Sequence, residues 1–233
     1  MHLHRLFPTA IATQQLRLDP LELADALRSV LDLRGAAEGN STPGCAWTGD
    51  LNGVWQLHRR PPFDAFAHRV SDVAWAYLEA LGFDGSAIAL HLQRSWPVVS
   101  DWDQVVGRHH HPNAHLSAVL YLSGSGSGDD GVLRLHAPGR PNELVPGLAA
   151  GDGGPIADQH PLNLDHWDLC PQPGLLVLFP SHLDHSVLPN SDPDALRCSI
   201  SYDFVLTAPR EGDPPEYLAP HPQQWEPRRS PSA

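Results

Sequence analysis

Apolar residues recur at intervals of three and four in two stretches of the first third of the chain, and this period predicts two amphipathic helices. The first begins near Asp19, where Asp-Pro-Leu-Glu is typical of a capped helix start with proline in the first turn, and Gly35 can end it. The second is expected from about Asp64 to Leu81, with Gly82 behind it. Its apolar stripe consists of Phe66, Val70, Val73, Ala74, Tyr77 and Leu78.

From about residue 86 the pattern changes to short apolar runs between glycine-, proline- and aspartate-rich turns, which is typical of β-strands. Several such strands predict a sandwich or a jelly-roll barrel, with the helices as a buttress on one face. Residues 137–173 are rich in glycine and proline and have little periodicity, so we interpret them as one long loop and a candidate lid. The predicted strands are Ala87–Trp96, Leu116–Ser123, Gly131–His136, Leu175–Phe179 and Arg197–Thr207.

The length of 233 residues, without an internal repeat or a clear linker, predicts one domain over 1–233. We expect a helical buttress over about 15–85 and a jelly-roll core over about 86–207. The last part, 208–233, is Pro-rich and is expected to form an extended tail.

Composition excludes several classes of function. A formal net charge of -12 argues against nucleic-acid and membrane partners. All 15 cations are Arg, so neither a Schiff-base lysine nor a P-loop lysine is present. The three cysteines show no metal-site or disulfide spacing, and the sequence shows neither a signal peptide nor a membrane span. We therefore expect a cytoplasmic protein; its oligomeric state does not follow from the sequence.

Histidine is abundant, with 15 residues, and two His-containing segments flank predicted strands. Arg108–His115 precedes one strand, and Phe179–Val187 follows another. In an extended backbone His109 and His111 share a face, because side chains alternate with period two. A third histidine from a distant strand would complete a metal site, since imidazole suits Fe, Zn, Cu or Ni.

A single histidine at a strand end is usually a surface residue, but an arginine at a suggestive distance in the sequence accompanies His185. Arg197 follows it by twelve residues and begins Arg-Cys-Ser on a new strand, so Arg197 and Ser199 share a face. A guanidinium binds a carboxylate through two hydrogen bonds, and a hydroxyl can add another. This pair therefore predicts a carboxylate-binding site near the histidines.

These segments together resemble the 2-oxoglutarate/Fe(II)-dependent oxygenase superfamily. Its pattern is His-x-carboxylate before one strand, a distal His at the end of a later strand, then Arg-x-Ser. The match is closest to a group of these oxygenases with H-x-H-P and F-P-S-x-L-x-H-x-V-x-P-N segments, here His109–Pro112 and Phe179–Asn190. The aspartyl/asparaginyl β-hydroxylases have similar segments, and the resemblance covers roughly 40–207.

The resemblance implies a double-stranded β-helix, a jelly-roll barrel of the cupin type, with Fe(II) and 2-oxoglutarate as cofactors. It implies His109 and His185 as iron ligands, and Arg197 with Ser199 as the site for the 5-carboxylate of 2-oxoglutarate. Tyr121 takes the place of a hydroxyl that such enzymes often add to that carboxylate. The implied activity is an Fe(II) dioxygenase that uses O₂ to hydroxylate or otherwise oxidise a small molecule or an amino-acid or peptidyl side chain.

Position 111 departs from the superfamily, because His stands where the common facial triad has Asp or Glu. His111 can be a third ligand, or can lie beside a two-His site that water completes. In a third interpretation the register is shifted, with His111 as first ligand and Asn113 two residues later. We favour His109 with His111 on or near the metal. One alternative function is a three-His cupin-type dioxygenase without 2-oxoglutarate, which has no need of Arg197 and Ser199. Another is a non-catalytic metal- or ligand-binding barrel.

Overall fold

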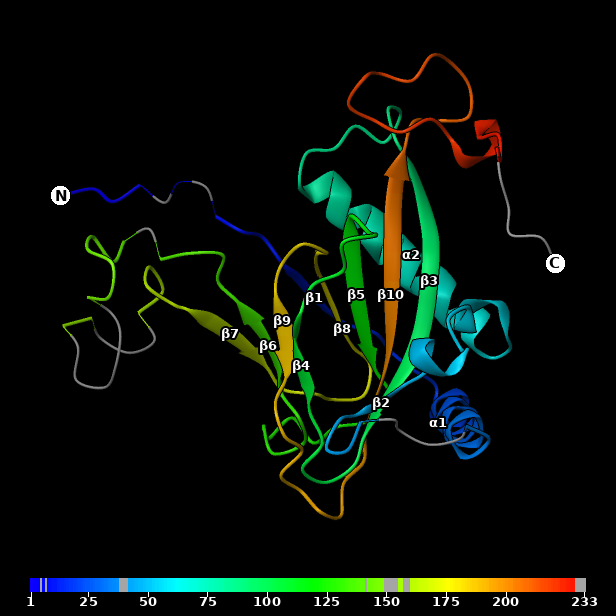
Figure 1. Cartoon of the computed structure of the whole chain (residues 1–233), viewed down its shortest axis with the longest axis vertical. Coiled ribbons are helices and arrows are strands. Elements are labelled where there is room, and N and C mark those ends of the chain that lie inside the picture. Colours follow the sequence, from blue (N-terminus) through cyan, green and yellow to red (C-terminus); the bar gives the residue numbers. More distant parts are fainter. Residues whose placement is uncertain are drawn as a thin grey trace.

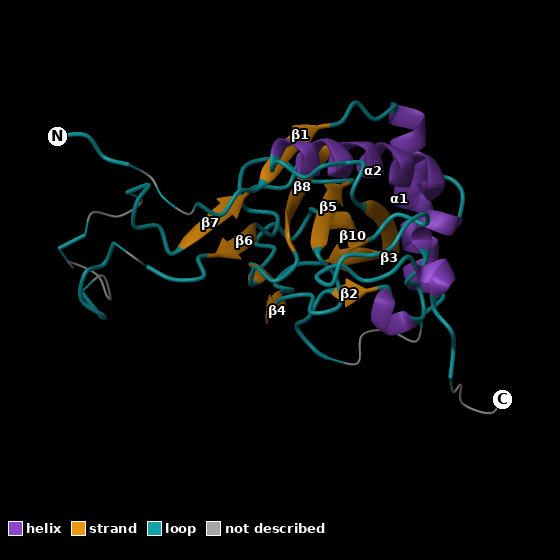
Figure 2. Cartoon of the chain, turned by 90° about the horizontal axis from the view of Figure 1, so that it is seen from above, coloured by secondary structure: helices purple, strands orange, loops and turns teal. Residues whose placement is uncertain are grey.

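A computed structural model of the whole chain describes residues 1–4, 6, 8–37, 42–140, 142–148, 155–156 and 160–228. Two antiparallel sheets face each other, and two helices cover the outside of the larger one (Figures 1 and 2). Its six strands are, in spatial order, β1 (Ala12–Gln15), β8 (Leu175–Pro180), β5 (Leu116–Tyr121), β10 (Arg197–Thr207), β3 (Ala89–Ser100) and β2 (Trp47–Thr48). The smaller sheet contains β4 (Val106–His109), β9 (His185–Val187), β6 (Leu133–His136) and β7 (His166–Leu169).

This architecture is the expected double-stranded β-helix, in which the inner faces of the two sheets enclose a barrel. The predicted strand over 197–207 is confirmed with the same bounds. The strands predicted to begin at residues 116, 131 and 175 are confirmed as well, and each of their ends differs from the prediction by at most two residues. The predicted strand over 87–96 begins at Ala89 and continues to Ser100. Strands β1, β2, β4 and β9 were not predicted, because each has only two to four residues and no apolar alternation of its own.

The interpretation of 137–173 as one loop was wrong in part. β7 lies within this segment and pairs with β6, with Leu133 opposite Leu169 and His136 opposite His166. The polar residues of β7 hid it, since only one face of this edge strand packs against the barrel. In Figures 1 and 2 the described residues that directly follow β6 and directly precede β7 extend away from the rest of the molecule.

Both predicted helices are present. Helix α1 (Pro20–Gly35) begins where the Asp19 side chain accepts hydrogen bonds from the backbone N–H groups of Leu21 and Glu22. Helix α2 (Phe63–Ala80) ends before Gly82, whose φ of +89° suits glycine. Three short 3-10 helices complete the elements: η1 (Asp50–Asn52), η2 (Leu57–Arg59) and η3 (Pro222–Gln224). None of the helices in the described ranges is both long and apolar enough to cross a lipid bilayer.

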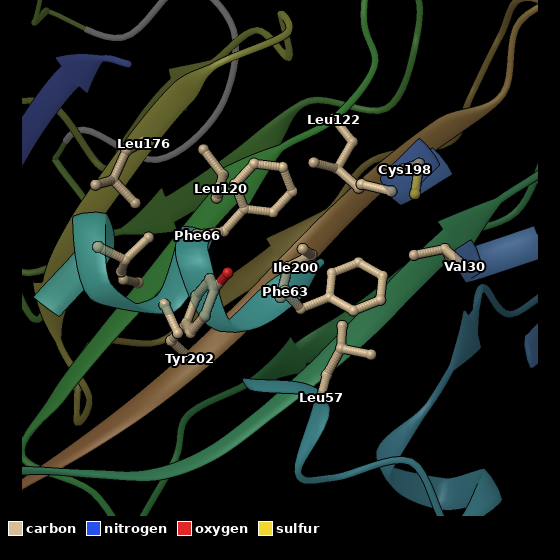
Figure 3. Packing of buried hydrophobic residues seen from close by; sticks show 14 of the residues in the cluster. Val30, Leu57, Phe63, Phe66, Leu120, Leu122, Leu176, Cys198, Ile200 and Tyr202 are labelled. Atoms are coloured by element: carbon tan, nitrogen blue, oxygen red, sulfur yellow. The ribbon is translucent and has the colours of Figure 1, made fainter. Parts of the chain in front are cut away.

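The main core lies between α2 and the large sheet. Phe63 and Phe66 of α2 point toward Leu120 of β5 and Ile200 of β10, all buried (Figure 3). A second, smaller cluster fills the barrel between the two sheets and includes Val119, Tyr121, Leu133 and Phe179. Alternate residues of β5 thus belong to different cores, which leaves the inner face of the strand to line the site.

Replacement of Leu120 by Ala should lower the free energy of unfolding by about 2 to 5 kcal/mol, because the side chain is fully buried and its loss leaves a cavity. Urea titration followed by circular dichroism measures the change. Leu21→Ala is the control, since Leu21 is 81% exposed and should change the stability by less than about 0.5 kcal/mol. Equal effects of the two substitutions would contradict this description of the core.

Candidate metal and carboxylate site

The pairing of β4 with β9 brings two of the three candidate histidines together. His109 ends β4 and His185 begins β9, and the two residues are direct register partners in the antiparallel pair. Partners of this kind place their side chains on the same face, within about 5.5 Å at Cβ. His111 follows β4 by two residues, and its backbone N–H donates to the Ser181 carbonyl at 2.9 Å. Segments 76 residues apart therefore contribute to one cluster.

The nitrogens of these three rings converge. One ligand atom from each of His109, His111 and His185 lies within 4.8 Å of the other two, and Nε2 of His109 is 3.3 Å from Nε2 of His111. In the described part of the chain, no other group of three His, Cys, Asp or Glu side chains is suitably placed to hold a metal ion. A metal ion with three protein ligands and open positions fits this geometry.

Each ring has its second nitrogen next to an oxygen acceptor. Nδ1 of His109 lies 2.8 Å from the Gly107 carbonyl, and Nδ1 of His185 lies 3.0 Å from the Leu183 carbonyl. Nδ1 of His111 lies 2.7 Å from a carboxylate oxygen of Asp203. An imidazole that donates from Nδ1 leaves the lone pair of Nε2 for a metal. Two such lone pairs 3.3 Å apart repel each other unless a cation lies between them, so the donor set fits a metal ion.

The surroundings favour the neutral form of the imidazoles, which is the form that binds metals. Burial lowers the pKa of His185 to about 3, with a smaller contribution from the neighbouring His109. Burial also lowers the pKa of His109. These two rings are therefore neutral at pH 7, and a metal does not have to displace a proton from them.

Arg197 is a buried guanidinium whose hydrogen-bond partners are neutral. Its Nε donates to the Gly131 carbonyl at 2.8 Å, Nη1 to the Ser199 hydroxyl at 3.2 Å and Nη2 to the Tyr121 hydroxyl at 3.3 Å. It is 1% exposed, and no carboxylate of the described residues lies within ion-pair distance of it. A buried charge without a counter-ion is costly, so this arrangement favours an anionic ligand.

A glycine allows Arg197 to lie where it does. Gly131 has φ of +81°, and a Cβ there would come within 2.7 Å of Cδ of Arg197. Any larger residue at position 131 would displace the guanidinium stem. The sequence analysis did not single out this glycine, because turn glycines are frequent in the segment 124–131.

A single cavity of about 470 Å³ contains both groups of residues. The three histidines, Arg197 and Ser199 all line it. Tyr121 does not line it; this residue is fully buried, with its ring 5.0 Å from the Arg197 guanidinium carbon. Asn113 also lines the cavity, whereas the described residues of the suggested lid, among them His160, Asp165, His166 and Trp167, do not, and Asp158 lies outside the described residues.

Further cavity residues were missed by the sequence analysis. On β10 the alternation that joins Arg197 to Ser199 continues to Ser201 and Asp203, and all four line the cavity. Period two could have identified Asp203. Trp96 and Arg94 line the cavity from β3, with Asp50 from η1. No signal in the sequence connects these three residues with the histidines, because the pairing of β3 with β10 brings them together.

Comparisons with known proteins agree with this site. Residues 94–203 match the family described as "Putative 2OG-Fe(II) oxygenase", a segment that includes the three histidines, Arg197, Ser199 and Asp203. A comparison with curated protein sequences gave no match.

Several solved structures have the same fold, and two of the three described below contain α-ketoglutarate (2-oxoglutarate). The epimerase SnoN in complex with Fe³⁺, α-ketoglutarate and nogalamycin RO is 18% identical, with 91% of each chain covered and a TM-score of 0.55. HygX from Streptomyces hygroscopicus, with nickel and 2-oxoglutarate bound, is 13% identical, with 91% of this chain and 84% of that chain covered and a TM-score of 0.52. A prolyl-4-hydroxylase from Pseudomonas putida is 21% identical, with 84% of this chain and 92% of that chain covered and a TM-score of 0.51.

The family match over residues 94–203 and the shared fold confirm the resemblance to the 2-oxoglutarate/Fe(II)-dependent oxygenases. The cofactors of these enzymes are Fe(II) and 2-oxoglutarate, and the donor set of the cavity fits both.

Proposed function

We propose that this protein hydroxylates, or otherwise oxidises, a small-molecule or amino-acid-type substrate, with iron held by His109, His111 and His185. The observation that carries the proposal is one cavity that holds both three convergent imidazoles and a buried arginine to which no described carboxylate is paired. When bound, Fe(II) and 2-oxoglutarate supply oxidative decarboxylation coupled to the reduction of O₂, which delivers one oxygen atom to the substrate.

Arg197 and Ser199 hold the 5-carboxylate of 2-oxoglutarate in this proposal. The guanidinium offers a charged donor, and the Ser199 hydroxyl lies 3.2 Å from its Nη1. Tyr121 holds Arg197 from outside the cavity lining. Its hydroxyl accepts a hydrogen bond from Nη2 of Arg197, and its ring lies beside the guanidinium. This arrangement fixes the position of the anchor before the ligand arrives, which lowers the entropy lost on binding.

Another part of the cavity lining, around Trp96, is suited to a polar substrate. The Trp96 ring lies 5.5 Å from the His111 ring, and the Arg94 guanidinium lies 4.9 Å above Trp96. Arg94 also forms an ion pair with Asp50 at 3.0 Å. Charges of both signs beside an aromatic face suit an amino acid or another small polar molecule. A cavity of about 470 Å³ is in the size range of small-molecule sites.

The three-His set favours one alternative, a cupin-type dioxygenase that does not use 2-oxoglutarate. Such an enzyme needs the metal but has no use for a buried, unpaired Arg197 beside Ser199. A non-catalytic binding barrel is the remaining alternative. The cytoplasmic location and the absence of nucleic-acid and membrane partners stay predictions from composition.

Succinate formation distinguishes these functions. Protein loaded with Fe(II) without oxygen and then mixed with 2-oxoglutarate and O₂ should form succinate slowly, and faster when an amino acid or peptide from a substrate screen is accepted. Mass spectrometry of the same mixtures identifies the oxidised product. Metal-free protein is the control and should form none. No succinate formation, together with no 2-oxoglutarate binding by calorimetry, would contradict the proposal.

A further inference from the structure

Asp203 is the carboxylate nearest to the histidine that replaces the usual acidic ligand. Its Oδ1 lies 2.7 Å from Nδ1 of His111, and the residue is 1% exposed on the inner face of β10. In the other two histidines, Nδ1 lies next to a backbone carbonyl instead of a carboxylate. His111 alone of the three therefore contacts a charged acceptor.

Among the described residues, His111 is the side chain placed to balance the charge of Asp203. No arginine of the described residues lies within ion-pair distance of Asp203. A buried carboxylate without a positive partner is costly. An imidazole that holds a divalent cation on Nε2 becomes more positive at Nδ1–H, so it is a better partner for the carboxylate than the free imidazole.

Hydroxyl groups hold the carboxylate in place. Ser117 is the register partner of Asp203 on β5, and its Oγ donates to Oδ1 of Asp203 at 2.9 Å. Ser117 uses its single proton in that bond, so the contacts of its Oγ with Ser181 at 2.8 Å and with Nδ1 of His111 at 3.0 Å are ones in which Ser117 accepts. The Ser117 hydroxyl and the Nδ1–H of His111 thus both donate to the Asp203 carboxylate, which fixes the tautomer of His111.

The total charge of the metal ligands suggests a function for the Asp203 carboxylate. A common facial triad contributes one negative charge to Fe(II), whereas three neutral imidazoles contribute none. We propose that Asp203 supplies the missing negative charge from behind His111, as a positioning residue that tightens metal binding through the imidazole. The proposal rests on the metal site of the proposed function, and it explains how this chain tolerates a histidine at position 111.

Metal affinity of the full-length protein tests the proposal independently of turnover. Titration of metal-free protein with Co(II), followed by its visible spectrum and by calorimetry, should give an affinity about 10- to 100-fold lower for Asp203→Asn than for the wild type. Asp165→Asn is the matched control, because Asp165 also contacts Nδ1 of a histidine, His166, but outside the cavity. It should leave the affinity within about threefold of wild type, less than the loss expected when a supporting group is removed.

A second comparison separates charge from packing. His111→Asp restores an acidic ligand, and the new carboxylate then faces Asp203 without an imidazole between them. In this background Asp203→Asn should change the Co(II) affinity by much less than it does in the wild type, because no imidazole Nδ1–H is left for the carboxylate to orient and polarise. Circular dichroism monitors the fold of each protein, so a loss of affinity that comes from misfolding is recognised.

The outcomes distinguish the two levels of the proposal. Wild-type protein that binds no Co(II) would overturn both the metal site and the role of Asp203. Wild-type binding with an unchanged affinity in Asp203→Asn would overturn the role of Asp203 alone. An equal loss in both backgrounds would also overturn it, since that result indicates a purely structural role.

Discussion

Replacing Arg197 with leucine should weaken 2-oxoglutarate binding by roughly 30- to 5,000-fold, equivalent to about 2 to 5 kcal/mol, the usual cost of truncating one partner of a buried charge pair. The guanidinium is buried, its protein partners are neutral, and it lines the cavity of the three histidines. Calorimetry with Ni(II)-loaded protein measures this affinity without turnover.

Two further variants make the Arg197 result specific. Arg197→Lys keeps the charge but not the paired donors, so its affinity should lie between those of wild type and Arg197→Leu. Arg134→Leu removes an arginine that pairs with Asp168 and does not line the cavity, so it should bind 2-oxoglutarate as the wild type does. Full affinity in Arg197→Leu would show that the carboxylate binds elsewhere.

Substitution of His185 by alanine should weaken metal binding by more than the roughly 100-fold expected for the loss of a supporting group, and should abolish succinate formation. His185 is the most buried of the three histidines, and its Nδ1 is held by the Leu183 carbonyl. Burial keeps its pKa near 3, so the ring is a neutral ligand throughout the usual pH range. Co(II) titration gives the affinity.

His110 provides the control within the same His-rich segment. It lies between two of the cluster residues in the sequence, but its Nδ1 is 3.2 Å from Asp184, and it is not one of the three converging rings. His110→Ala should therefore bind Co(II) within about threefold of the wild type, since it removes neither a ligand nor a group that supports one. A large loss in this variant, or none in His185→Ala, would mean that the metal is held by a different set of side chains.

The sequence predicted the parts of this fold that local pattern encodes. The helices follow from their period and from the cap at Asp19. The long strands follow from a mainly apolar run in β5 and from the alternation of polar and apolar residues in β10. Strands β4 and β9 are short, and their residues acquire a regular structure only by pairing within the smaller sheet, β4 with β9 and β9 also with β6. Their existence is a property of the barrel, and no local pattern predicts it.

In the site, too, local pattern predicts some residues and strand pairing determines the others. The pair Arg197 and Ser199 was accessible because period two acts within one strand, and the same period reaches Asp203. Trp96 and Arg94 could not be found, since their place beside the histidines depends on the register of β3 against β10. Tyr121 was found, but the structure places its hydroxyl on Arg197 and outside the cavity lining.

A crystal structure of the protein with Mn(II) and 2-oxoglutarate, grown without oxygen, is the most direct test of the central claim. We expect one metal ion on Nε2 of His109, His111 and His185, with the 5-carboxylate of 2-oxoglutarate on Arg197 and Ser199. Asp203 should still accept from Nδ1 of His111. A metal ion bound by only two of the histidines, or a 2-oxoglutarate carboxylate that does not contact Arg197, would contradict it.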